Sequence, residues 1–220
     1  MSVRVKICGL REPAGWDAAV EAGADWLGLV FFPRSPRFVT SAEAARLAAR
    51  GTGSAGLVGL FVAPFGDDEI RAVLDAIPLV ALQVYGAAPT SSGAPGLPTA
   101  ASLSERLGIP VWSAVGVSSR EDLPETARGA ERLVIEAKPP AGATRPGGNA
   151  AQFDWTVLRG WRAPAPWAVG GGLTPENVAE AIGITGTQAV DVSSGVEMAP
   201  GVKDPRLIRA FIRAARSASV

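Results

Sequence analysis

The 220-residue sequence is long enough for one large domain or two small ones, and 47% hydrophobic with 19% charged residues is typical of a folded globular protein. Lys and Arg number 21, as do Asp and Glu, so the basic excess of a nucleic-acid-binding protein is missing and we expect no nucleic-acid partner. The absence of His excludes imidazole acid–base catalysis, Ser-His and Cys-His nucleophiles and His-ligated metals.

The single cysteine, Cys8, excludes an intramolecular disulfide, and a chain this poor in cysteine needs no oxidising compartment. Charged Arg4 and Lys6 stand where a signal peptide needs an apolar core, and no uncharged stretch holds the ~20 apolar residues of a membrane span. We therefore expect a cytoplasmic protein that neither is secreted nor crosses a membrane.

Short apolar or β-branched runs alternate with helical patterns along the whole chain, which is typical of repeated βα units. The eight predicted strands are residues 3–8, 26–31, 55–62, 79–84, 110–115, 132–137, 167–170 and 189–192. The predicted helices include residues 13–22, 41–50, 67–76, 174–182 and 205–217, and the fourth of them begins with Thr174 as N-cap and Pro175 at its first helical position.

Eight such units in this length fit a compact (β/α)₈ TIM barrel better than an open doubly wound sheet, which has five or six strands. We therefore predict one α/β barrel domain over residues 1–220. Residues 87–98 and 139–151, rich in Gly and Pro, are predicted loops. Because loops after barrel strands form the active-site face, we interpret 139–151 as a lid over a ligand.

Residues 51–56, Gly-Thr-Gly-Ser-Ala-Gly, match the dinucleotide-binding pattern GxGxxG. That pattern binds a pyrophosphate only where a strand leads through the glycines into the N-terminus of a helix. Here a predicted helix comes before the glycines and a strand after them. The match therefore does not indicate a cofactor site.

Two turns stand where a barrel usually binds phosphate, after strands seven and eight. Gly170, Gly171 and Gly172 follow the seventh strand, and Ser193, Ser194 and Gly195 follow the eighth. Glycines let backbone amides approach an anion closely, and the serines add hydroxyl donors. Either turn alone is explained by tight chain reversal, but together they favour a phosphorylated substrate.

Three ionisable residues end strands on the same predicted rim. Cys8 ends the first strand and is followed by Gly9, which gives access to a thiol base, although a lone strand cysteine is more often a small buried hydrophobe. Glu136 closes the sixth strand and Asp191 lies near the end of the eighth, so that two carboxylates converge for acid–base work. The alternative for either carboxylate is an ion pair with inward-facing Lys6.

A further candidate lies in the loop after the second strand, where Pro36 restricts Arg37 and the following Phe38 and Val39 anchor it. An arginine held in this way can bind a carboxylate or a phosphate. The alternative is an exposed loop arginine without a ligand.

Six segments, in this order and at barrel spacing, resemble the phosphoribosylanthranilate isomerase family of tryptophan biosynthesis from end to end. They are KICGL at 6–10, GLVFFPRSPR at 28–37, GLFV at 59–62, FDW at 153–155, GGLTPENV at 171–178 and DVSSGVE at 191–197. The resemblance implies a (β/α)₈ barrel and an Amadori rearrangement of N-(5-phosphoribosyl)anthranilate, with neither metal nor coenzyme. It also implies a monomer or homodimer.

The resemblance also assigns roles to the candidate residues. Cys8 takes the position of the base that removes the C2 proton, and Glu136 that of the acid that opens the ribose ring. Arg37 corresponds to the residue that binds the anthranilate carboxylate, and Asp191 to a substrate-binding carboxylate. Gly171, Gly172, Ser193, Ser194 and Gly195 correspond to the phosphate-binding turns.

The chain departs from the family pattern at Glu136, where Asp is usual, at Tyr85, where His is frequent, and at residues 147–150, where Gly-Thr-Gly is common. Two other functions remain as alternatives. The related histidine-pathway isomerase rearranges a substrate with two phosphates, but it needs paired aspartates, whereas the first strand here ends in Cys8. The second alternative is a barrel that binds phosphorylated metabolites and catalyses weakly or not at all.

Overall fold

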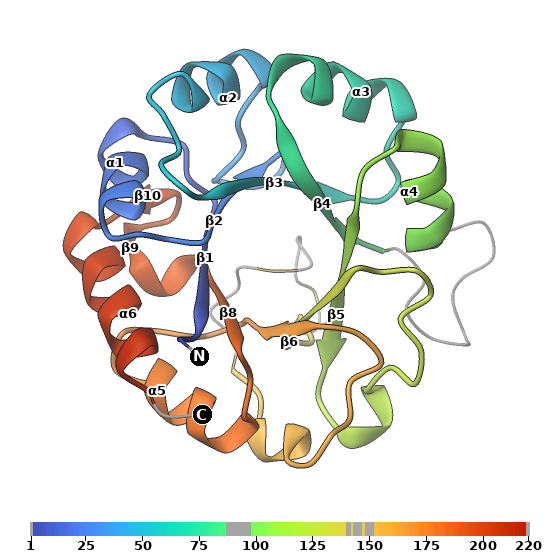
Figure 1. Cartoon of the computed structure of the whole chain (residues 1–220), viewed down its shortest axis with the longest axis vertical. Helices are drawn as coiled ribbons and strands as arrows, with labels where there is room; N and C mark the ends of the chain where they lie inside the picture. Colours follow the sequence, from blue (N-terminus) through green and yellow to red (C-terminus); the bar gives the residue numbers. More distant parts are fainter. Residues whose placement is uncertain (1, 87–97, 140–141, 143–146, 148–151, 219–220) are drawn as a thin grey trace.

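The computed structural model describes residues 2–86, 98–139, 142, 147 and 152–218, and eight of its strands close into a parallel barrel in chain order (Figure 1). These strands are β1 Arg4–Cys8, β2 Trp26–Val30, β3 Gly56–Val62, β4 Leu79–Tyr85, β5 Val111–Val117, β6 Arg132–Ala137, β7 Trp167–Val169 and β8 Ala189–Val192. Strand β8 pairs with β1, with Asp191 opposite Lys6. The predicted (β/α)₈ barrel is confirmed, and every strand end lies within two residues of its predicted position.

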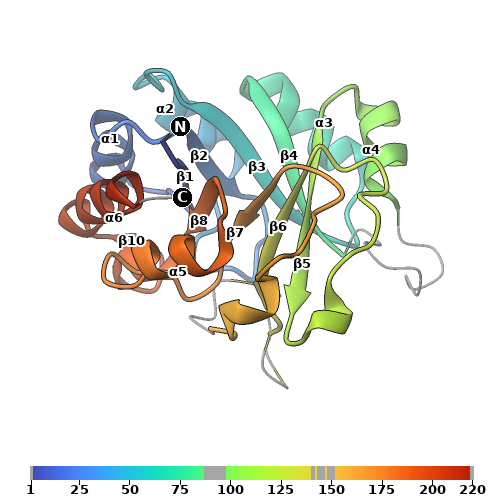
Figure 2. The same cartoon turned by 60° about the horizontal axis from the view of Figure 1, so that its bottom comes forward.

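Helices surround the barrel on the outside, as Figure 2 shows from a second direction. They are α1 Pro13–Glu21, α2 Ser41–Ala48, α3 Asp67–Ala76, α4 Ala100–Leu107, α5 Val178–Thr185 and α6 Pro205–Ser217. Strands β5 and β6 are followed only by the 3₁₀ turns η1 Arg120–Asp122 and η2 Trp155–Leu158 in the part of the chain described here. The repeat is therefore less regular than eight full βα units.

The predicted helix over 174–182 begins one turn later than expected, as α5 at Val178. Thr174 does cap a turn, since its hydroxyl accepts a hydrogen bond from the Glu176 amide, and its own amide donates to the Asn177 side chain at 2.7 Å. These local side-chain bonds compete with helical ones and hold residues 174–177 as a turn. The helix then continues to Gly186, whose left-handed φ of 67° ends it.

The GxGxxG segment runs from just after α2 to Gly56, the first residue of β3, so a helix comes before it and a strand after it, as predicted. The carbonyl of Gly51 accepts a hydrogen bond from the Trp16 indole at 2.8 Å. The predicted loop 87–98 lies outside the described residues except for position 98, and the lid candidate 139–151 except for 139, 142 and 147.

Side chains fill the inside of the barrel in layers, because alternate residues of each strand point inward. The layer at the amino-terminal ends of the strands is apolar and buried, and comprises Trp26, Val58, Ala81, Trp112, Val134, Ala168 and Ala189. The layer at the carboxyl ends contains Cys8, Val30, Leu60, Tyr85 and Ala114. Between them lie the buried polar side chains of Lys6, Gln83 and Asp191.

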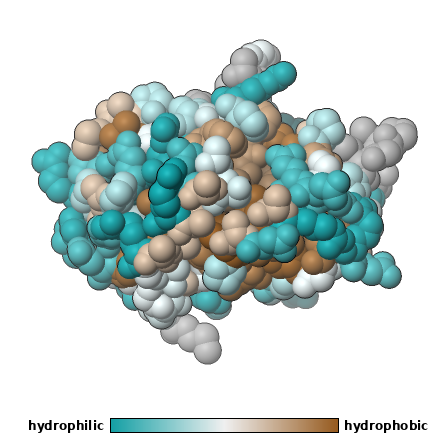
Figure 3. Space-filling model, turned by 90° about the horizontal axis from the view of Figure 1, so that it is seen from above, coloured by the Kyte–Doolittle hydropathy of each residue, from teal (hydrophilic) through white to brown (hydrophobic). Residues whose placement is uncertain are grey.

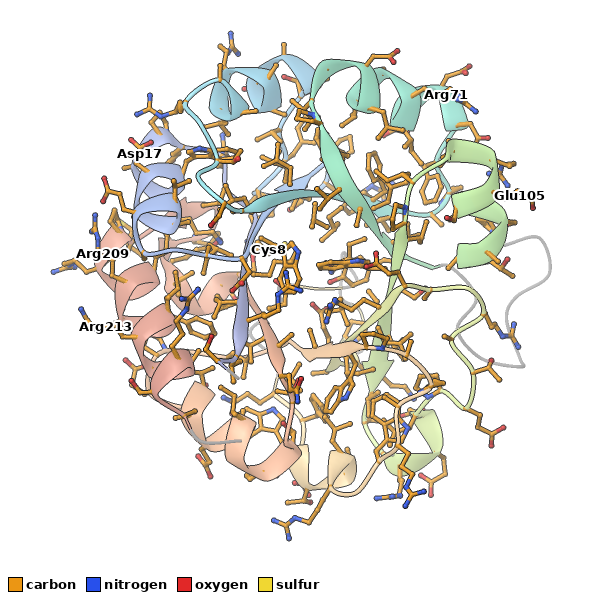
Figure 4. The ribbon with its side chains drawn as sticks, viewed as in Figure 1. Cys8, Asp17, Arg71, Glu105, Arg209 and Arg213 are labelled. Carbon is orange, nitrogen blue, oxygen red and sulfur yellow. The ribbon has the colours of Figure 1, made fainter. Side chains whose placement is uncertain are left out.

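The outer surface differs from the interior in its chemistry. In Figure 4, Cys8 lies near the barrel axis, whereas Asp17, Arg71, Glu105, Arg209 and Arg213 are carried by the surrounding helices. The face shown in Figure 3 has hydrophilic residues on both flanks of a hydrophobic band. Among the helices described, none is both long and apolar enough to cross a membrane.

Candidate active site

A pocket opens at the carboxyl ends of the barrel strands and is lined by all nine residues that the sequence predicts for the site. These are Cys8, Arg37, Glu136, Gly171, Gly172, Asp191, Ser193, Ser194 and Gly195. Apolar walls come from Val30, Phe32, Leu60, Val62 and Leu173. The nine candidate residues come from five strands or the loops after them and therefore meet in one place, as the barrel topology requires.

Cys8 stands at the end of β1 beside a buried ion pair. Lys6 is on the same face of the strand, two residues earlier, and its Nζ lies 3.0 and 2.9 Å from the two carboxylate oxygens of Asp191. The ion pair considered from sequence is thus present. Burial lowers the pKa of Lys6, but the charge and hydrogen bonds of Asp191 together with the Cys8 thiolate outweigh burial and raise this pKa above its ordinary value, so Lys6 stays a cation below the thiol.

The Cys8 thiol is 5% exposed and packs among apolar side chains, yet it opens on the pocket. Burial raises its pKa above the ordinary value, and the Lys6 cation opposes that rise. Cys8 is therefore both a small buried side chain and a residue that lines the pocket, so neither the buried-hydrophobe interpretation nor the thiol-base interpretation is excluded. Its thiolate requires the nearby ammonium group for stabilisation.

Glu136, near the end of β6, forms a hydrogen bond with Tyr85 of β4. The Tyr85 hydroxyl donates to Oε2 of Glu136 at 2.6 Å. Burial and then the negative charge of Asp191 raise the pKa of Glu136 to about 7, while the Tyr85 hydrogen bond opposes this rise. A carboxyl with this pKa is partly protonated near neutral pH and can donate a proton, as the sequence predicts for an acid at this position.

Arg37 is 4% exposed, so the alternative of an exposed loop arginine is wrong. The backbone after it is anchored as expected, because Val39 donates to the Val30 carbonyl at 3.0 Å. Its guanidinium binds the carboxylate of Glu197 through Nε at 2.7 Å and Nη2 at 2.8 Å. A guanidinium has five donors, and among the hydrogen bonds of the described residues Nη1 and the second hydrogen of Nη2 have no acceptor, so they remain for a ligand.

The two glycine- and serine-containing turns lie against each other. Gly171 and Gly172 have left-handed φ angles of 76° and 66°, which a residue with a side chain rarely adopts. A Cβ on Gly195 would lie 1.7 Å from the Leu173 carbonyl oxygen, so only glycine allows this approach. Among the hydrogen bonds of the described residues, neither the Gly171 nor the Gly172 amide has an acceptor, so both remain for an anion.

Sequence reasoning missed two charged residues that support the site. Glu197 begins the short strand β9 Glu197–Ala199, and Lys203 ends its antiparallel partner β10 Val202–Lys203. Lys203 Nζ lies 2.7 Å from Glu197 Oε1 and 2.9 Å from the Ser193 carbonyl. Neither residue lines the pocket, and no periodicity marks them, because both lie in a hairpin outside the barrel. Glu197 is the last residue of the DVSSGVE segment, but the resemblance was not used to give it a role.

Where the structure describes the chain, no group of three or more Cys, Asp or Glu side chains is arranged to hold a metal ion.

Comparisons with known proteins agree with this geometry. The family model for N-(5'phosphoribosyl)anthranilate (PRA) isomerase matches residues 5–214. The chain is 52% identical over 215 residues to an N-(5'-phosphoribosyl)anthranilate isomerase of Acidiphilium cryptum, covering 98% of this chain and 99% of the relative. It is 50% identical over 215 residues to the protein of that name from Paracoccus denitrificans, covering 96% of each.

Solved structures are similar over the same length. Phosphoribosyl anthranilate isomerase from Thermotoga maritima superposes with a TM-score of 0.78 at 32% identity, covering 97% of this chain and 98% of that one. A solved isomerase in complex with reduced 1-(o-carboxyphenylamino)-1-deoxyribulose 5-phosphate gives a TM-score of 0.75 at 31% identity with the same coverage. The chain belongs to the N-(5'-phosphoribosyl)anthranilate isomerase family and is therefore an isomerase of tryptophan biosynthesis.

Proposed function

We propose that this chain converts N-(5-phosphoribosyl)anthranilate into 1-(2-carboxyphenylamino)-1-deoxyribulose 5-phosphate by an Amadori rearrangement, with Glu136 as general acid and Cys8 as general base. The observation that carries the proposal is that these two groups line one pocket together with two elements suited to bind anions. One element is the Arg37 guanidinium, and the other is the pair of turns at Gly171–Gly172 and Ser193–Gly195. The Glu136 carboxyl, with a pKa of about 7, is suited to give up a proton near neutral pH. Metal ions and coenzymes have no part in the proposed steps.

In the first step, Glu136 protonates the ribose ring oxygen and the C1–O bond breaks, which leaves an iminium ion between C1 and the anilinic nitrogen. Tyr85 stays protonated, because burial and the Glu136 charge raise its pKa well above the ordinary value. Its hydroxyl therefore acts as a permanent donor to Oε2. That leaves Oε1 of Glu136 to carry the proton that the ring oxygen receives.

In the second step, the Cys8 thiolate removes the proton from C2, and the electrons of the C2–H bond form a C1=C2 double bond as the iminium is neutralised. The resulting enolamine takes up a proton at C1, loses the proton of its C2 hydroxyl and so becomes the ketone product. Lys6, held by Asp191, places a positive charge near the sulfur and so favours the thiolate. The same cation is already neutralised by Asp191, which limits the effect.

The substrate's two anionic groups fit opposite elements of the pocket. The unused fork of Arg37 is positioned for the anthranilate carboxylate, and guanidinium–carboxylate pairs of this kind are strong and directional. The amides of Gly171, Gly172 and Gly195 and the hydroxyls of Ser193 and Ser194 provide donors for the phosphate. In this proposal Asp191 accepts a hydrogen bond from the substrate while it holds Lys6.

Complementation of a tryptophan auxotroph that lacks this isomerase tests the proposal. The parent gene should restore growth without tryptophan, and the Cys8→Ala gene should not, at equal protein levels. A barrel that binds phosphorylated metabolites without converting them would restore growth in neither case. An isomerase of the histidine type would instead turn over the aminoimidazole substrate in a purified assay, which the proposal expects to fail.

We further propose that the chain works in the cytoplasm as a single barrel domain, either as a monomer or as a homodimer. One relative from Thermotoga maritima is described as a dimeric phosphoribosylantranilate isomerase of which monomers were made. The nine candidate site residues are brought together within one barrel, so we propose that each subunit has a site of its own. Sedimentation of the purified chain across concentration would distinguish the two states, and activity per chain should be the same in both.

A further inference from the structure

Two buried cations share one carboxylate on the side of the pocket formed by the loops after β2 and β8. Glu197 Oε1 accepts from both Arg37 Nε and Lys203 Nζ, each at 2.7 Å, and Oε2 accepts from Arg37 Nη2 at 2.8 Å. The Arg37, Glu197 and Lys203 side chains are 5%, 4% and 1% exposed. Burying three charges is costly unless each is paired, so this cluster is a defined feature and not a solvated surface contact.

The cluster of Arg37, Glu197 and Lys203 connects the Arg37 loop to the Ser193 turn. At one end stands Arg37, proposed above to bind the carboxylate. At the other end, Lys203 Nζ binds the Ser193 carbonyl at 2.9 Å and approaches the Ser193 hydroxyl at 3.4 Å. Glu197 is the shared link, so a shift of either element is transmitted to the other through one carboxylate.

The backbone is shaped to bring these pieces together. Gly201, in the turn between β9 and β10, lies so close to the loop that carries Arg37 that a Cβ there would be 2.3 Å from the Pro36 carbonyl oxygen. Gly15 of α1 leaves room for the Lys203 stem, since a Cβ would lie 2.8 Å from Lys203 Cβ. The β9–β10 hairpin therefore packs between α1 and the loop after β2, and in this position Glu197 and Lys203 contact Arg37 and Ser193.

We propose that Glu197 and Lys203 are positioning residues that fix Arg37 relative to the Ser193 turn, so that the pocket selects substrates with a carboxylate and a phosphate at one set separation. This inference rests on the proposed function, because it takes the carboxylate and phosphate to be the two anions. It also explains how specificity would arise, because Glu197 and Lys203, which touch no substrate, would set the distance between Arg37 and the Ser193 turn.

The charge of the cluster supports this assignment. Two cations and one anion leave a surplus of one positive charge, which an incoming anionic substrate balances. Burial lowers the pKa of Lys203 to about 8, against the opposing effect of Glu197. The charged and titratable groups that face Lys203 are Glu197, Arg37 and Cys8, and of the cluster's own members only Lys203 loses its charge as the pH rises from 7 to 9. The positioning contact therefore weakens over that range.

Binding measurements by calorimetry separate this role from a purely structural one. The first probe is reduced 1-(o-carboxyphenylamino)-1-deoxyribulose 5-phosphate, the compound bound in the related solved structure, and the second is the same compound without its carboxylate. The variant is Glu197→Gln, which keeps the volume and removes the charge. The matched control is Asp67→Asn, which breaks the surface ion pair with Arg106, also bound through two nitrogens at 3.0 and 2.8 Å.

For Glu197→Gln we expect about tenfold or greater loss of affinity for the carboxylate-bearing probe, since a misplaced Arg37 loses a charge-assisted hydrogen bond. The loss for the probe without a carboxylate should be several times smaller, and Asp67→Asn should change neither. Equal losses for both probes would overturn the proposal. Tighter binding of the carboxylate-bearing probe would also overturn it, because Glu197 would then be a competitor for Arg37.

A pH series of the same Kd keeps the proposal testable if Glu197→Gln does not fold. In the parent, the Kd of the carboxylate-bearing probe should rise between pH 7 and 9 as Lys203 loses its proton, and in Lys203→Arg the rise should be smaller, because the titration of Glu136, whose pKa is about 7, remains but that of Lys203 does not. A level Kd in the parent, or the same rise in both proteins, would overturn the inference. A parent that binds neither probe would instead contradict the proposed function itself.

Discussion

The two ends of the barrel interior are built from the same alternation of inward-facing residues but have opposite chemistry. At the amino-terminal end, Trp26 and Trp112 pack edge to face with ring centroids 5.0 Å apart, and the Arg4 and Arg132 guanidiniums lie 4.0 and 4.8 Å from the Trp26 ring centre. At the carboxyl end, Cys8 and Glu136 face a pocket. One end is closed by packing, whereas the other keeps titratable groups buried at an energetic cost.

This contrast teaches that stability and chemistry are separated along the barrel axis. Large apolar side chains fill the closed end, and none of the nine candidate site residues lies there. At the open end, the pKa of Glu136 is raised to about 7 because a carboxyl is held among buried groups beside another carboxylate. Variants at the two ends should therefore affect different measurable quantities.

The largest expected effect on turnover, apart from loss of the base, comes from Glu136→Gln at the open end. The amide keeps the shape but cannot donate the proton that opens the ring, so kcat should fall about 10²–10⁴-fold. The unfolding temperature should not decrease, because the variant removes a buried charge. A steady-state assay with N-(5-phosphoribosyl)anthranilate checks this. Turnover at the parental rate would show that a group other than Glu136 is the acid.

The pH dependence of kcat/KM sharpens the same assignment. In the proposed mechanism, the active form has a protonated Glu136 and a Cys8 thiolate, although Glu136 has the lower pKa of the two. When Glu136 and Cys8 hold one proton between them, most pairs have the proton on the thiol, and the active form is the minority with the proton on Glu136. The singly protonated pair appears as the pH rises through about 7 and disappears above the pKa of the thiol. In the parent, kcat/KM should rise through about pH 7, and in Glu136→Gln this limb should be absent.

At the closed end, Trp112→Ala should reverse the pattern. The indole is 2% exposed, and removing a buried aromatic side chain typically costs about 3–5 kcal/mol of unfolding free energy. Denaturant unfolding should show that loss, while kcat per folded molecule stays at the parental value at low temperature. A large fall in kcat with unchanged stability would contradict the claim that the closed end contributes to stability and not to turnover.

A smaller effect is expected for Arg37→Ala, which removes the donor proposed to bind the carboxylate. Hydrogen bonds to charged groups contribute about 1.5–3 kcal/mol, so KM should rise about tenfold or more while kcat changes less. A substrate analogue without the carboxylate provides the control, because its affinity should be nearly the same in both proteins. If both ligands lose affinity equally, Arg37 does not bind the carboxylate.

The smallest effect belongs to Arg4→Gln at the closed end. Arg4 is half exposed and stacks on Trp26, a contact of about 0.5–1 kcal/mol at such sites. The variant should lower the unfolding free energy by that amount and leave kcat and KM unchanged. A change in either kinetic constant would show that the closed end influences the pocket.

The sequence was sufficient for the barrel because periodicity and turn chemistry are local. The start of α5 was misplaced, since the side-chain bonds of Thr174 and Asn177 that delay it depend on the folded turn. The pocket residues were predictable because barrel strands end on one rim. The partners Glu197 and Lys203 were not, because their positions come from a hairpin that packs 160 residues away in sequence from Arg37.

Turnover by Cys8→Ala, measured together with its thermal unfolding, tests the central claim most directly. Loss of a general base typically costs about 10²–10⁴-fold in rate, whereas replacing a small buried thiol by a methyl group leaves the barrel folded. The account predicts a fall of that size in kcat for N-(5-phosphoribosyl)anthranilate in a protein that unfolds near the parental temperature. A folded Cys8→Ala variant with nearly parental kcat would contradict the claim that the carboxyl end of the barrel performs the reaction through this thiol.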